Sequence, residues 1–476
     1  MRSKKNPVVS SFPQAEPKPR AAVHSLGCRL NHAEADSLRQ HLESAGYQVV
    51  PWGEAAEVCV LNSCTVTGNS DAKSRQALRS IRRKYPQAKL AVVGCYAQMG
   101  SAELAGGGLA DLIVGTQEKM EVVRHLKQLK DGPQAPVVIN RPIRRGAFRQ
   151  GGASLEVAAD EPQPVGAAGG LTGPEGPVRW TRGHLKVQDG CDFMCSFCVI
   201  SFARGRARPR EWEDMLREAR QMAQGGIREL VLTGVNVGTF QEGGRGLEEL
   251  VDGLARVDGI TRLRIGSIEP TTVGDGLLER MADPGHCLQP FLHLPLQSGA
   301  DGILSAMKRR YTAGEYLDFA RKALARVEGL CLGTDVLAGF PGETDALHQE
   351  TRWFLEELPF AYFHVFPYSP RKGTPAAGMA DPVSHQIKQQ RVKELTALSN
   401  AKRLAFQAGF VGKTVEVLFE KSKTEGTAQG YTPHYIRVEV AADNPDRLWN
   451  RVERVRLNAP GLPVMGGELI HFGTTG

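Results

Sequence analysis

The sequence predicts an α/β fold in three parts, and three apolar patterns indicate it. Residues 21–130 alternate short apolar runs such as AAVHS and LAVVG with helical patterns, which is typical of an open α/β domain. From 184 to 366, six strand-like runs alternate with helical patterns, so we expect a partial (β/α)6 TIM-like barrel with its chemistry at the carboxyl ends of the strands. After a helical stretch at 383–408, short β-like runs indicate a small β-barrel of a kind that often binds nucleic acid.

These patterns also set the expected domain limits. We expect an N-terminal domain at 20–130, a barrel domain at 181–408 and a C-terminal domain at 409–475. The stretch 131–180 is rich in Gly, Pro and Ala and lacks periodicity, which favours a linker or an inserted loop. A chain of 476 residues is long enough for two or three domains.

Composition limits the class of protein. Hydrophobic residues make up 41% and charged residues 23%, which argues against disorder and against a fibrous repeat. No apolar run approaches the roughly 20 residues that a membrane helix needs, and the N-terminus lacks the apolar core of a signal peptide. We therefore expect a cytoplasmic protein with no membrane partner. In that reducing compartment, nine cysteines favour metal binding or catalysis over disulfides.

The charge pattern leaves two readings open. The net charge of +7 is modest, but basic residues gather at 73–89, 141–149 and 204–210. A polyanionic partner is one explanation, and a set of solvated faces is the other.

The strongest motif is CDFMCSFC, which places Cys191, Cys195 and Cys198 directly after the first strand of the barrel domain. Three thiolates can hold three irons of a cubane and leave the fourth iron open. A structural zinc site requires four ligands, and no fourth Cys or His lies nearby in the sequence. The spacing therefore predicts a [4Fe-4S] cluster with one open iron, where S-adenosylmethionine (SAM) can chelate.

A second triad is spread over the N-terminal domain. Cys28, Cys64 and Cys95 each fall in a loop just past an apolar strand, in SLGC, LNSC and VVGC. Because the carboxyl ends of parallel strands meet in one crevice, these cysteines can surround one metal centre. The alternative is three unrelated buried thiols, since Cys is often buried. Cys59, Cys287 and Cys331 fit that alternative better.

The CDFMCSFC segment resembles the radical SAM superfamily, in which an aromatic residue commonly precedes the third cysteine, as Phe197 does here. The resemblance implies SAM contacts in LTGVNVG, with Thr233 and Gly234, and in SIEP, with Ser267 and Glu269. The segment GTDVLAGFPG resembles a later part of the SAM pocket. Glycines at strand ends are common in any α/β fold, so these signals are weaker than the cysteine motif.

Both triads together resemble the methylthiotransferase family over nearly the whole chain. The resemblance implies an N-terminal cluster domain, a radical SAM core and a C-terminal TRAM domain. Within the family, NSCTVTGNSDAKSRQ, ARGRARPR and HVFPYSPRKGTP are most similar to the MtaB-type enzymes. Those enzymes convert N6-threonylcarbamoyladenosine at tRNA position 37 to its 2-methylthio form, with two [4Fe-4S] clusters, SAM, and an external electron donor of the flavodoxin or ferredoxin type.

Candidate contacts to tRNA follow from the basic residues. The run AKSRQALRSIRRKYP favours Lys73, Arg79 and Arg83 for the phosphates of the anticodon stem. The threonylcarbamoyl group carries a carboxylate, so we expect a basic partner near it, with Arg204 or Arg206 as the candidates. The C-terminal domain is a second candidate for RNA contacts.

Other functions remain open from the sequence. A methylthiotransferase acting on isopentenyladenosine in tRNA or on an aspartate of a ribosomal protein uses similar clusters. A non-catalytic iron-sulfur protein that binds or senses RNA belongs to a different class. Cleavage of SAM separates an enzyme from a sensor, and the sulfur acceptor separates the enzymes from one another.

Overall fold

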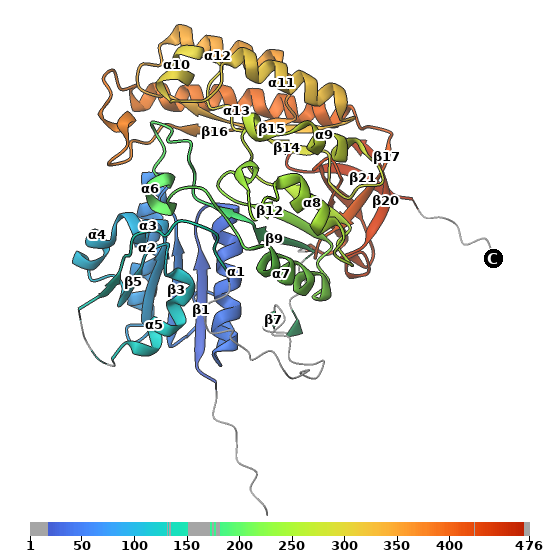
Figure 1. Cartoon of the computed structure of the whole chain (residues 1–476). Coiled ribbons are helices and arrows are strands. Elements are labelled where there is room, and N and C mark those ends of the chain that lie inside the picture. The colour runs from blue at the N-terminus through green and yellow to red at the C-terminus, as the bar shows by residue number, and fades with distance from the viewer. Residues whose placement is uncertain are drawn as a thin grey trace, which may run out of the picture.

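The computed structural model describes residues 18–130, 132, 135–150, 172–173, 176–177, 181–422 and 424–470. Figure 1 shows the N-terminal α/β domain beside the central barrel, with the C-terminal β-barrel at the opposite side. The α/β fold class with this three-part arrangement is confirmed. No helix in the described part of the chain combines the length and the apolar character that crossing a membrane requires.

The N-terminal domain is a single parallel sheet with helices on both faces. In sheet order, its strands are β2 (Gln48–Val50), β1 (Arg20–Ser25), β3 (Val58–Ser63), β4 (Lys89–Gly94), β5 (Leu112–Val114) and β6 (Val137–Ile139). Its helices are α1 (Arg29–Ser44), α2 (Gly68–Lys84), α3 (Cys95–Met99), α4 (Ser101–Gly106), η1 (Lys119–Glu121) and α5 (Val122–Gln128). Leu38 of α1 and Leu126 of α5 pack on one face, while Leu78 of α2 and Leu104 of α4 pack on the other.

β6 lies in the stretch that we expected to be a linker. It pairs in parallel with β5, so the sheet continues past residue 130. The run VVI is mostly exposed, because this strand is at the edge of the sheet, and it therefore lacks the apolar pattern of a core strand. Most of 151–180 lies outside the described residues; within it, the short strands β7 (Thr172–Gly173) and β8 (Gly176–Pro177) pair with each other.

The central domain has the six expected parallel strands in sequential order. They are β9 (Arg182–Lys186), β12 (Glu229–Thr233), β13 (Arg262–Ile265), β14 (Phe291–His293), β15 (Cys331–Ala338) and β16 (Tyr362–Pro367). β13 and β14 are joined only by single bridges, such as Ser267 with His293. Within the described residues β16 does not pair with β9, so the barrel is open, as predicted.

Helices cover the outer face of this barrel. They are α7 (Trp212–Gln224), α8 (Leu247–Ala255), α9 (Asp275–Ala282), α10 (Asp301–Ala306), α11 (Ala313–Arg326), α12 (Asp345–Glu357) and α13 (His385–Ala408). The short helix α6 (Ile200–Arg204) instead packs against α3 of the N-terminal domain. The short elements of the domain are β10 (Gln188–Asp189), β11 (Arg208–Pro209), η2 (Val237–Thr239), η3 (Pro270–Thr272) and η4 (Pro375–Gly378). Alternate residues of the strands, such as Leu230, Leu263 and Leu292, pack against these helices, so the other set faces the inside. That inner set includes the polar residues Arg264, His293 and Asp335.

The C-terminal domain is a closed five-stranded barrel, in the order β17 (Thr414–Phe419), β18 (Thr427–Tyr431), β19 (Arg437–Ala441), β21 (Met465–Leu469) and β20 (Val452–Ala459), with η5 (Pro445–Arg447) before β20. Its core contains Val417, Phe419, Val438 and Val455. The sequence has a β-like run, ELIHFG, at this end of the chain. β21 begins earlier, at Met465, and residues 471–476 lie outside the described part. The closed barrel is consistent with a TRAM-like domain.

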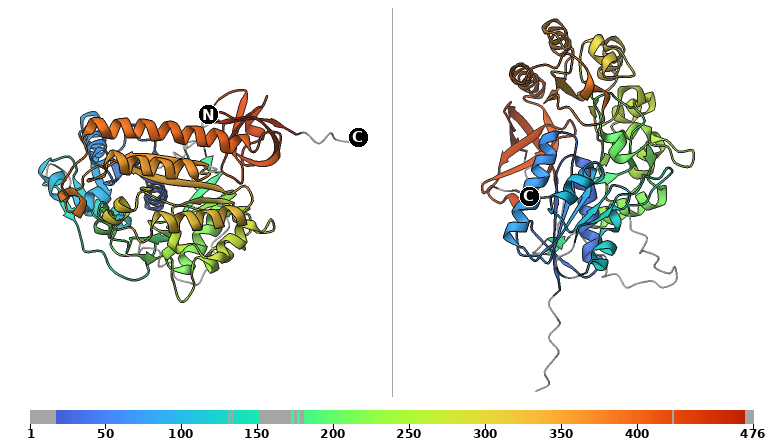
Figure 2. Two further views of the ribbon diagram at one scale, coloured as in Figure 1. Left: turned by 90° about the horizontal axis from the view of Figure 1, so that it is seen from above. Right: turned by 90° about the vertical axis from the view of Figure 1, so that its left-hand side faces the viewer.

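This small barrel covers the amino-terminal ends of the central strands. Arg262 and Arg264 donate hydrogen bonds to the carbonyls of Tyr431 and Pro433 at 2.8 and 3.0 Å. Arg182 pairs with Glu420 at 2.8 Å. Figure 2 shows α13 running across the molecule to the side of the C-terminal barrel. The carboxyl ends of the central strands are therefore left for the chemistry.

Candidate active site

The first cysteine triad lies at the reversal point of the N-terminal sheet. Cys28 follows β1, Cys64 follows β3 and Cys95 follows β4, and these three strands are neighbours in the sheet. The strand order reverses between β1 and β3, and open α/β sheets bind their ligands at such a point. The structure therefore brings the three predicted cysteines to one crevice.

A glycine allows this approach. Gly27 has a φ of +104°, and a Cβ atom there would lie 2.6 Å from Cys64 Sγ. A side chain at this position would push the loop that carries Cys28 away from Cys64. Asn31 of α1 holds the same loops by donating to the carbonyls of Leu26 and Ser63 at 2.7 and 3.1 Å.

The second triad lies in the loop that follows β10. Each sulfur receives one hydrogen bond at 3.4 Å: the Phe193 N–H donates to Cys191, the Ile200 N–H to Cys198, and the Arg309 guanidinium to Cys195. Ser196 fixes the middle of the loop, since its hydroxyl donates to the Ala306 carbonyl at 2.7 Å. Donors of this kind tune the potential of iron-sulfur clusters.

The chemistry of both triads fits a cluster better than a single ion. Among the described residues, only His293, Asp335 and His364 bring three ligand atoms within 4.8 Å of one another. The sulfurs of each cysteine triad therefore lie too far apart to bind one small ion together. Burial raises the pKa of Cys191 to about 11 and that of Cys198 to about 12. These thiols therefore lose their protons when a metal group binds, which links cluster binding to proton release.

One expected SAM segment, LTGVNVG, is linked to the loop of the second triad. Gln188 connects them, because its side-chain oxygen accepts from the N–H groups of Val235 and Asn236 at 2.9 and 3.1 Å, while its nitrogen donates to the Gly190 carbonyl at 2.8 Å. A Cβ atom on Gly234 would lie 2.8 Å from Gln188, so glycine permits this contact. Thr233 is buried and donates to the Leu185 carbonyl at 3.1 Å, so its hydroxyl supports the strand end.

Three more predicted residues differ in their surroundings. Ser267 is exposed at the end of β13, whereas Phe197 packs beside Phe340 and Tyr368. Glu269 is paired with Arg309, the same residue that donates to Cys195. Burial raises the pKa of Glu269 above its usual value. Arg309 thus joins a predicted SAM residue to a predicted cluster ligand.

A buried ion cluster joins the two triads. Glu34 of α1 accepts from Lys186 and Arg204 at 2.7 and 2.8 Å and also pairs with Lys119. Asp189 pairs with Lys186 at 2.8 Å, with Arg204 at 3.0 Å and with Arg208 at 3.5 Å. Two carboxylates thus face four cations, which leaves two positive charges in excess. The charges of Arg204 and Lys119 act on Cys95, so this excess fits an anionic thiolate-bound cluster there.

This ion cluster changes our expectation for Arg204. The residue is 1% exposed, and its guanidinium is used by Glu34, Asp189 and Asn31. It is therefore a positioning residue between the two triads and has no free donor face for a substrate carboxylate. Arg206 is 61% exposed and pairs with Asp192 at 3.3 Å, so it stays accessible to RNA.

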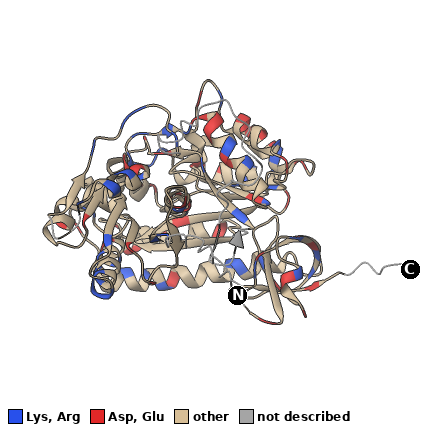
Figure 3. Ribbon diagram, turned by 90° about the horizontal axis from the view of Figure 1, so that it is seen from below, with Lys and Arg blue, Asp and Glu red and all other residues tan. Residues whose placement is uncertain are grey.

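The basic run on α2 divides into two sets. Arg75 pairs with Glu103 at 2.9 Å and Arg82 with Asp111 at 2.8 Å, so these two have structural partners. Lys73, Arg79 and Arg83 are exposed, and no ion pair is found for them in the part of the chain that is described. Figure 3 shows Lys and Arg positions mixed with Asp and Glu positions, so RNA contacts depend on local placement.

Two sequence segments that resemble the MtaB-type enzymes touch each other. Arg371, in HVFPYSPRKGTP, donates to the Thr65 hydroxyl at 2.7 Å and pairs with Asp71 at 2.5 Å. The Ala376 N–H, just past this segment, donates to the Ser196 carbonyl at 2.9 Å. This region therefore links the loop of Cys64 to the loop of Cys195.

The sequence analysis missed Gln188, Arg309 and Arg371. Gln188 lies in the strand-like run HLKVQ, where a final Gln carries no distinctive signal. Arg309 lies in the basic triplet KRR, shorter than the three runs that we considered. Arg371 was part of a recognised segment, but its partners are about 300 residues away in the sequence.

Comparisons with known proteins agree with this geometry. Residues 20–115 match the family described as Uncharacterized protein family UPF0004, and residues 185–354 match the Radical SAM superfamily. The chain is 33% identical to the threonylcarbamoyladenosine tRNA methylthiotransferase MtaB of Bacillus subtilis (strain 168), over 94% of this chain and 96% of that protein. It is 32% identical to the tRNA-2-methylthio-N(6)-dimethylallyladenosine synthase of Cereibacter sphaeroides, over 94% and 98% of the two chains.

One solved structure supports the fold. The radical SAM methyltransferase TsrM from Kitasatospora setae, with cobalamin and a [4Fe-4S] cluster bound, matches with a TM-score of 0.53 and 17% identity, over 76% of this chain and 77% of that chain. At this identity the match concerns the fold alone. The extent of the MtaB match, together with both family models and the two cysteine triads, shows that this chain belongs to the MtaB-type family of radical SAM methylthiotransferases.

Proposed function

We propose that the protein adds a methylthio group to carbon 2 of N6-threonylcarbamoyladenosine at tRNA position 37, giving the 2-methylthio derivative. The observation that carries this proposal is the presence of two three-cysteine sites joined by one buried ion cluster, in a chain whose MtaB relatives act on this nucleoside. Position 37 lies in the anticodon loop, where bases can be splayed and read.

Each triad has its own task in this proposal. Cys191, Cys195 and Cys198 would hold the cluster that binds SAM, and Cys28, Cys64 and Cys95 would hold the second cluster. When bound, these groups supply a 5′-deoxyadenosyl radical that takes hydrogen from the adenine, a sulfur atom, and a methyl group from a second SAM. The chain's own residues position these parts: Gln188 aligns the SAM loop with the Cys191 loop, and Arg371 fixes the loop of Cys64.

Expected SAM contacts are Phe197, Thr233, Gly234, Ser267 and Glu269. Thr233 and Gly234 shape the end of β12, while Ser267 and Glu269 follow β13 on the same side of the barrel. Glu269 is held by Arg309, so its carboxylate has a fixed direction.

The partners and the domain limits complete the proposal. An external electron donor of the flavodoxin or ferredoxin type reduces the SAM-binding cluster, and the reaction takes place in the cytoplasm. The limits 20–130, 131–180, 181–408 and 409–475 remain predictions, with β6 as an addition to the first sheet.

The function is tested with anaerobically reconstituted protein and two tRNAs in parallel, one with the threonylcarbamoyl group and one with the isopentenyl group. We expect the 2-methylthio product from the first tRNA only, by mass spectrometry of nucleosides. Cys64→Ala is expected to stop product formation while 5′-deoxyadenosine still forms. Turnover of the isopentenyl tRNA alone would contradict the assigned substrate, and methylthio product at the normal rate from Cys64→Ala would contradict the task of the first triad.

Charge reversal on α2 tests the contact with RNA. The triple change of Lys73, Arg79 and Arg83 to Glu is expected to weaken tRNA binding and to reduce the slope of log Kd against log salt by about 2 to 3. These side chains are exposed and have no structural partner among the described residues, so iron content should not change. Reversing Arg256, which is exposed at the end of α8 and has no ion pair among the described residues, is the control. An unchanged salt slope in the α2 variant would exclude this helix from the RNA contact.

A further inference from the structure

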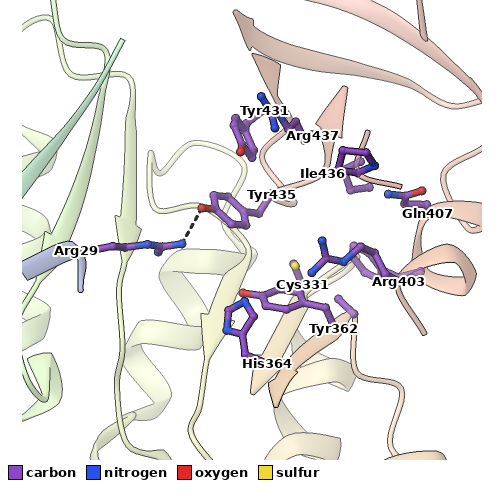
Figure 4. A pocket seen from close by; sticks show the side chains of 13 residues that line it. Arg29, Cys331, Tyr362, His364, Arg403, Gln407, Tyr431, Tyr435, Ile436 and Arg437 are labelled. Atoms are coloured by element: carbon purple, nitrogen blue, oxygen red, sulfur yellow. Dashed lines mark hydrogen bonds between the residues drawn. The ribbon is translucent and has the colours of Figure 1, made fainter. Parts of the chain in front are cut away.

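A cavity of about 260 Å³ lies where β15, β16, α13 and the C-terminal barrel meet. Figure 4 shows Arg29 reaching it from the start of α1, with Arg403 and Arg437 entering from other sides. The cavity is smaller than the roughly 300 Å³ at which pockets for drug-sized ligands begin. Its size therefore suits part of a nucleotide.

The charge of this cavity is unbalanced. Arg29, Arg403 and Arg437 line it, and no Asp or Glu does so within the described residues. Arg29 donates to the neutral Tyr435 hydroxyl at 2.8 Å, and Arg403 lies over the Tyr362 ring at 5.1 Å. Among the residues that the structure describes, neither Arg29 nor Arg403 has an ion pair. Arginines whose donors are not used by carboxylates are suited to bind an oxyanion in a bidentate manner.

Nearby arginines show the contrast. Arg182 is paired with Glu420 at 2.8 Å and Arg264 with Glu229 at 3.0 Å, so their charges are balanced. Arg29 and Arg403, which open into the cavity, have no such partner among the described residues. The positive charge is thus directed at the space inside the cavity.

The uncharged lining suits a polar group attached to a base. Tyr431 and Tyr435 stack with ring centroids 5.0 Å apart. His364 is 49% exposed, and its Nδ1 lies 3.1 Å from Asp335 Oδ1. Asp335 also pairs with His293 at 3.0 Å, so it fixes the ring of His364 and leaves Nε2 for a ligand.

The position of the cavity connects it to the chemistry. Arg29 directly follows Cys28, so its guanidinium is one side-chain length from a ligand of the proposed sulfur-delivering cluster. The substituent on N6 of the adenine must extend away from carbon 2, where sulfur is added. Arg29 therefore links the cavity to the proposed sulfur-delivering cluster, and an anion on that substituent is its expected partner.

We propose that this cavity receives the carboxylate of the threonylcarbamoyl group, paired with Arg29 and Arg403, with His364 available to its polar atoms. This assignment rests on the function proposed above. Arg29 and Arg403 would then be the basic partners of the N6 group, a role that Arg204 cannot fill because it is buried and already paired.

The test uses reconstituted full-length protein and two forms of one tRNA, with threonylcarbamoyladenosine or unmodified adenosine at position 37. Wild-type protein is expected to bind the first form more tightly. Arg403→Gln should weaken binding of the modified tRNA by roughly 10- to 100-fold and leave binding of the unmodified form unchanged, because only the first loses a charged hydrogen bond. Arg403→Lys, which keeps the charge, should recover part of the loss. Lys393→Gln, exposed on the same helix and outside the cavity, is the matched control.

The outcomes separate the possible explanations. Equal loss for both tRNAs, with a smaller salt slope, would assign the cavity to a backbone phosphate and overturn the carboxylate assignment. Full preference for the modified tRNA in Arg403→Gln would overturn it as well. If wild-type protein forms no methylthio product from the modified tRNA, the proposed function fails, and this result is read independently of the Arg403 variants.

Discussion

Replacing Cys191, Cys195 and Cys198 together with Ala is expected to abolish SAM cleavage and to remove about half of the roughly eight irons of two cubanes. The three thiols lie in one loop, and each sulfur receives one N–H donor, an arrangement that suits the ligands of one iron-sulfur cluster. Iron analysis and quantification of 5′-deoxyadenosine after reduction give the two readouts. The iron at the first triad should remain, because its ligands come from other strands.

Cys59→Ala is the control for this experiment. Cys59 is 1% exposed in the middle of β3 and packs with Ala22, Ile81 and Leu90. Its loss should cost some stability but no iron. Formation of 5′-deoxyadenosine by the triple variant would show that SAM is cleaved elsewhere, and loss of all iron would show that the two sites do not load independently.

Regular strands and helices could be predicted because their apolar residues recur with a clear period. All six central strands and α13 lie where the pattern placed them. The strands that were missed lack such a pattern. β2 has only three residues, and β18, TAQGY, is polar and contains a glycine. A Cβ atom on Gly430 would lie 2.5 Å from the Leu418 carbonyl oxygen, so this glycine is needed for close strand packing that no local pattern reveals.

The cysteine positions could be predicted for a different reason. Spacing alone identifies the second triad, and the rule that parallel strand ends converge identifies the first. The supporting residues could not be found in this way. Glu34 and Arg204 are 170 residues apart, and Arg29 and Tyr435 are 406 apart, so only the folded chain brings them together. From the sequence, Arg204 was only a basic residue near a cluster motif. Its burial and its partners show that it links the central domain to the N-terminal domain.

Glu34→Gln is expected to lower the free energy of unfolding by about 3 to 5 kcal/mol, the usual cost of removing one partner of a buried ion pair. Glu34 is 0% exposed and forms ion pairs with Lys119, Lys186 and Arg204. Without its carboxylate, only Asp189 faces the buried cations. The midpoint of urea unfolding, followed by tryptophan fluorescence, measures the loss. Iron content should fall because Asn31 is then the remaining partner of Arg204 on α1.

A control variant and the pH dependence distinguish the loss of a buried ion pair from the loss of an exposed one. Glu103→Gln removes an exposed pair with Arg75 and should cost roughly 0 to 1 kcal/mol. Although desolvation raises the pKa of Glu34, the charges of Arg204, Lys119 and Lys186 hold it well below the usual 4.5. A carboxylate whose pKa is lowered by folding stabilises the fold at pH values above the pKa that it has in the unfolded chain. The difference in the free energy of unfolding between wild type and Glu34→Gln should therefore shrink as the pH falls below about 4.5. A loss as small as that of Glu103→Gln, or one that does not depend on pH, would mean that the buried cations find other partners and that this ion cluster does not hold the two cysteine sites together.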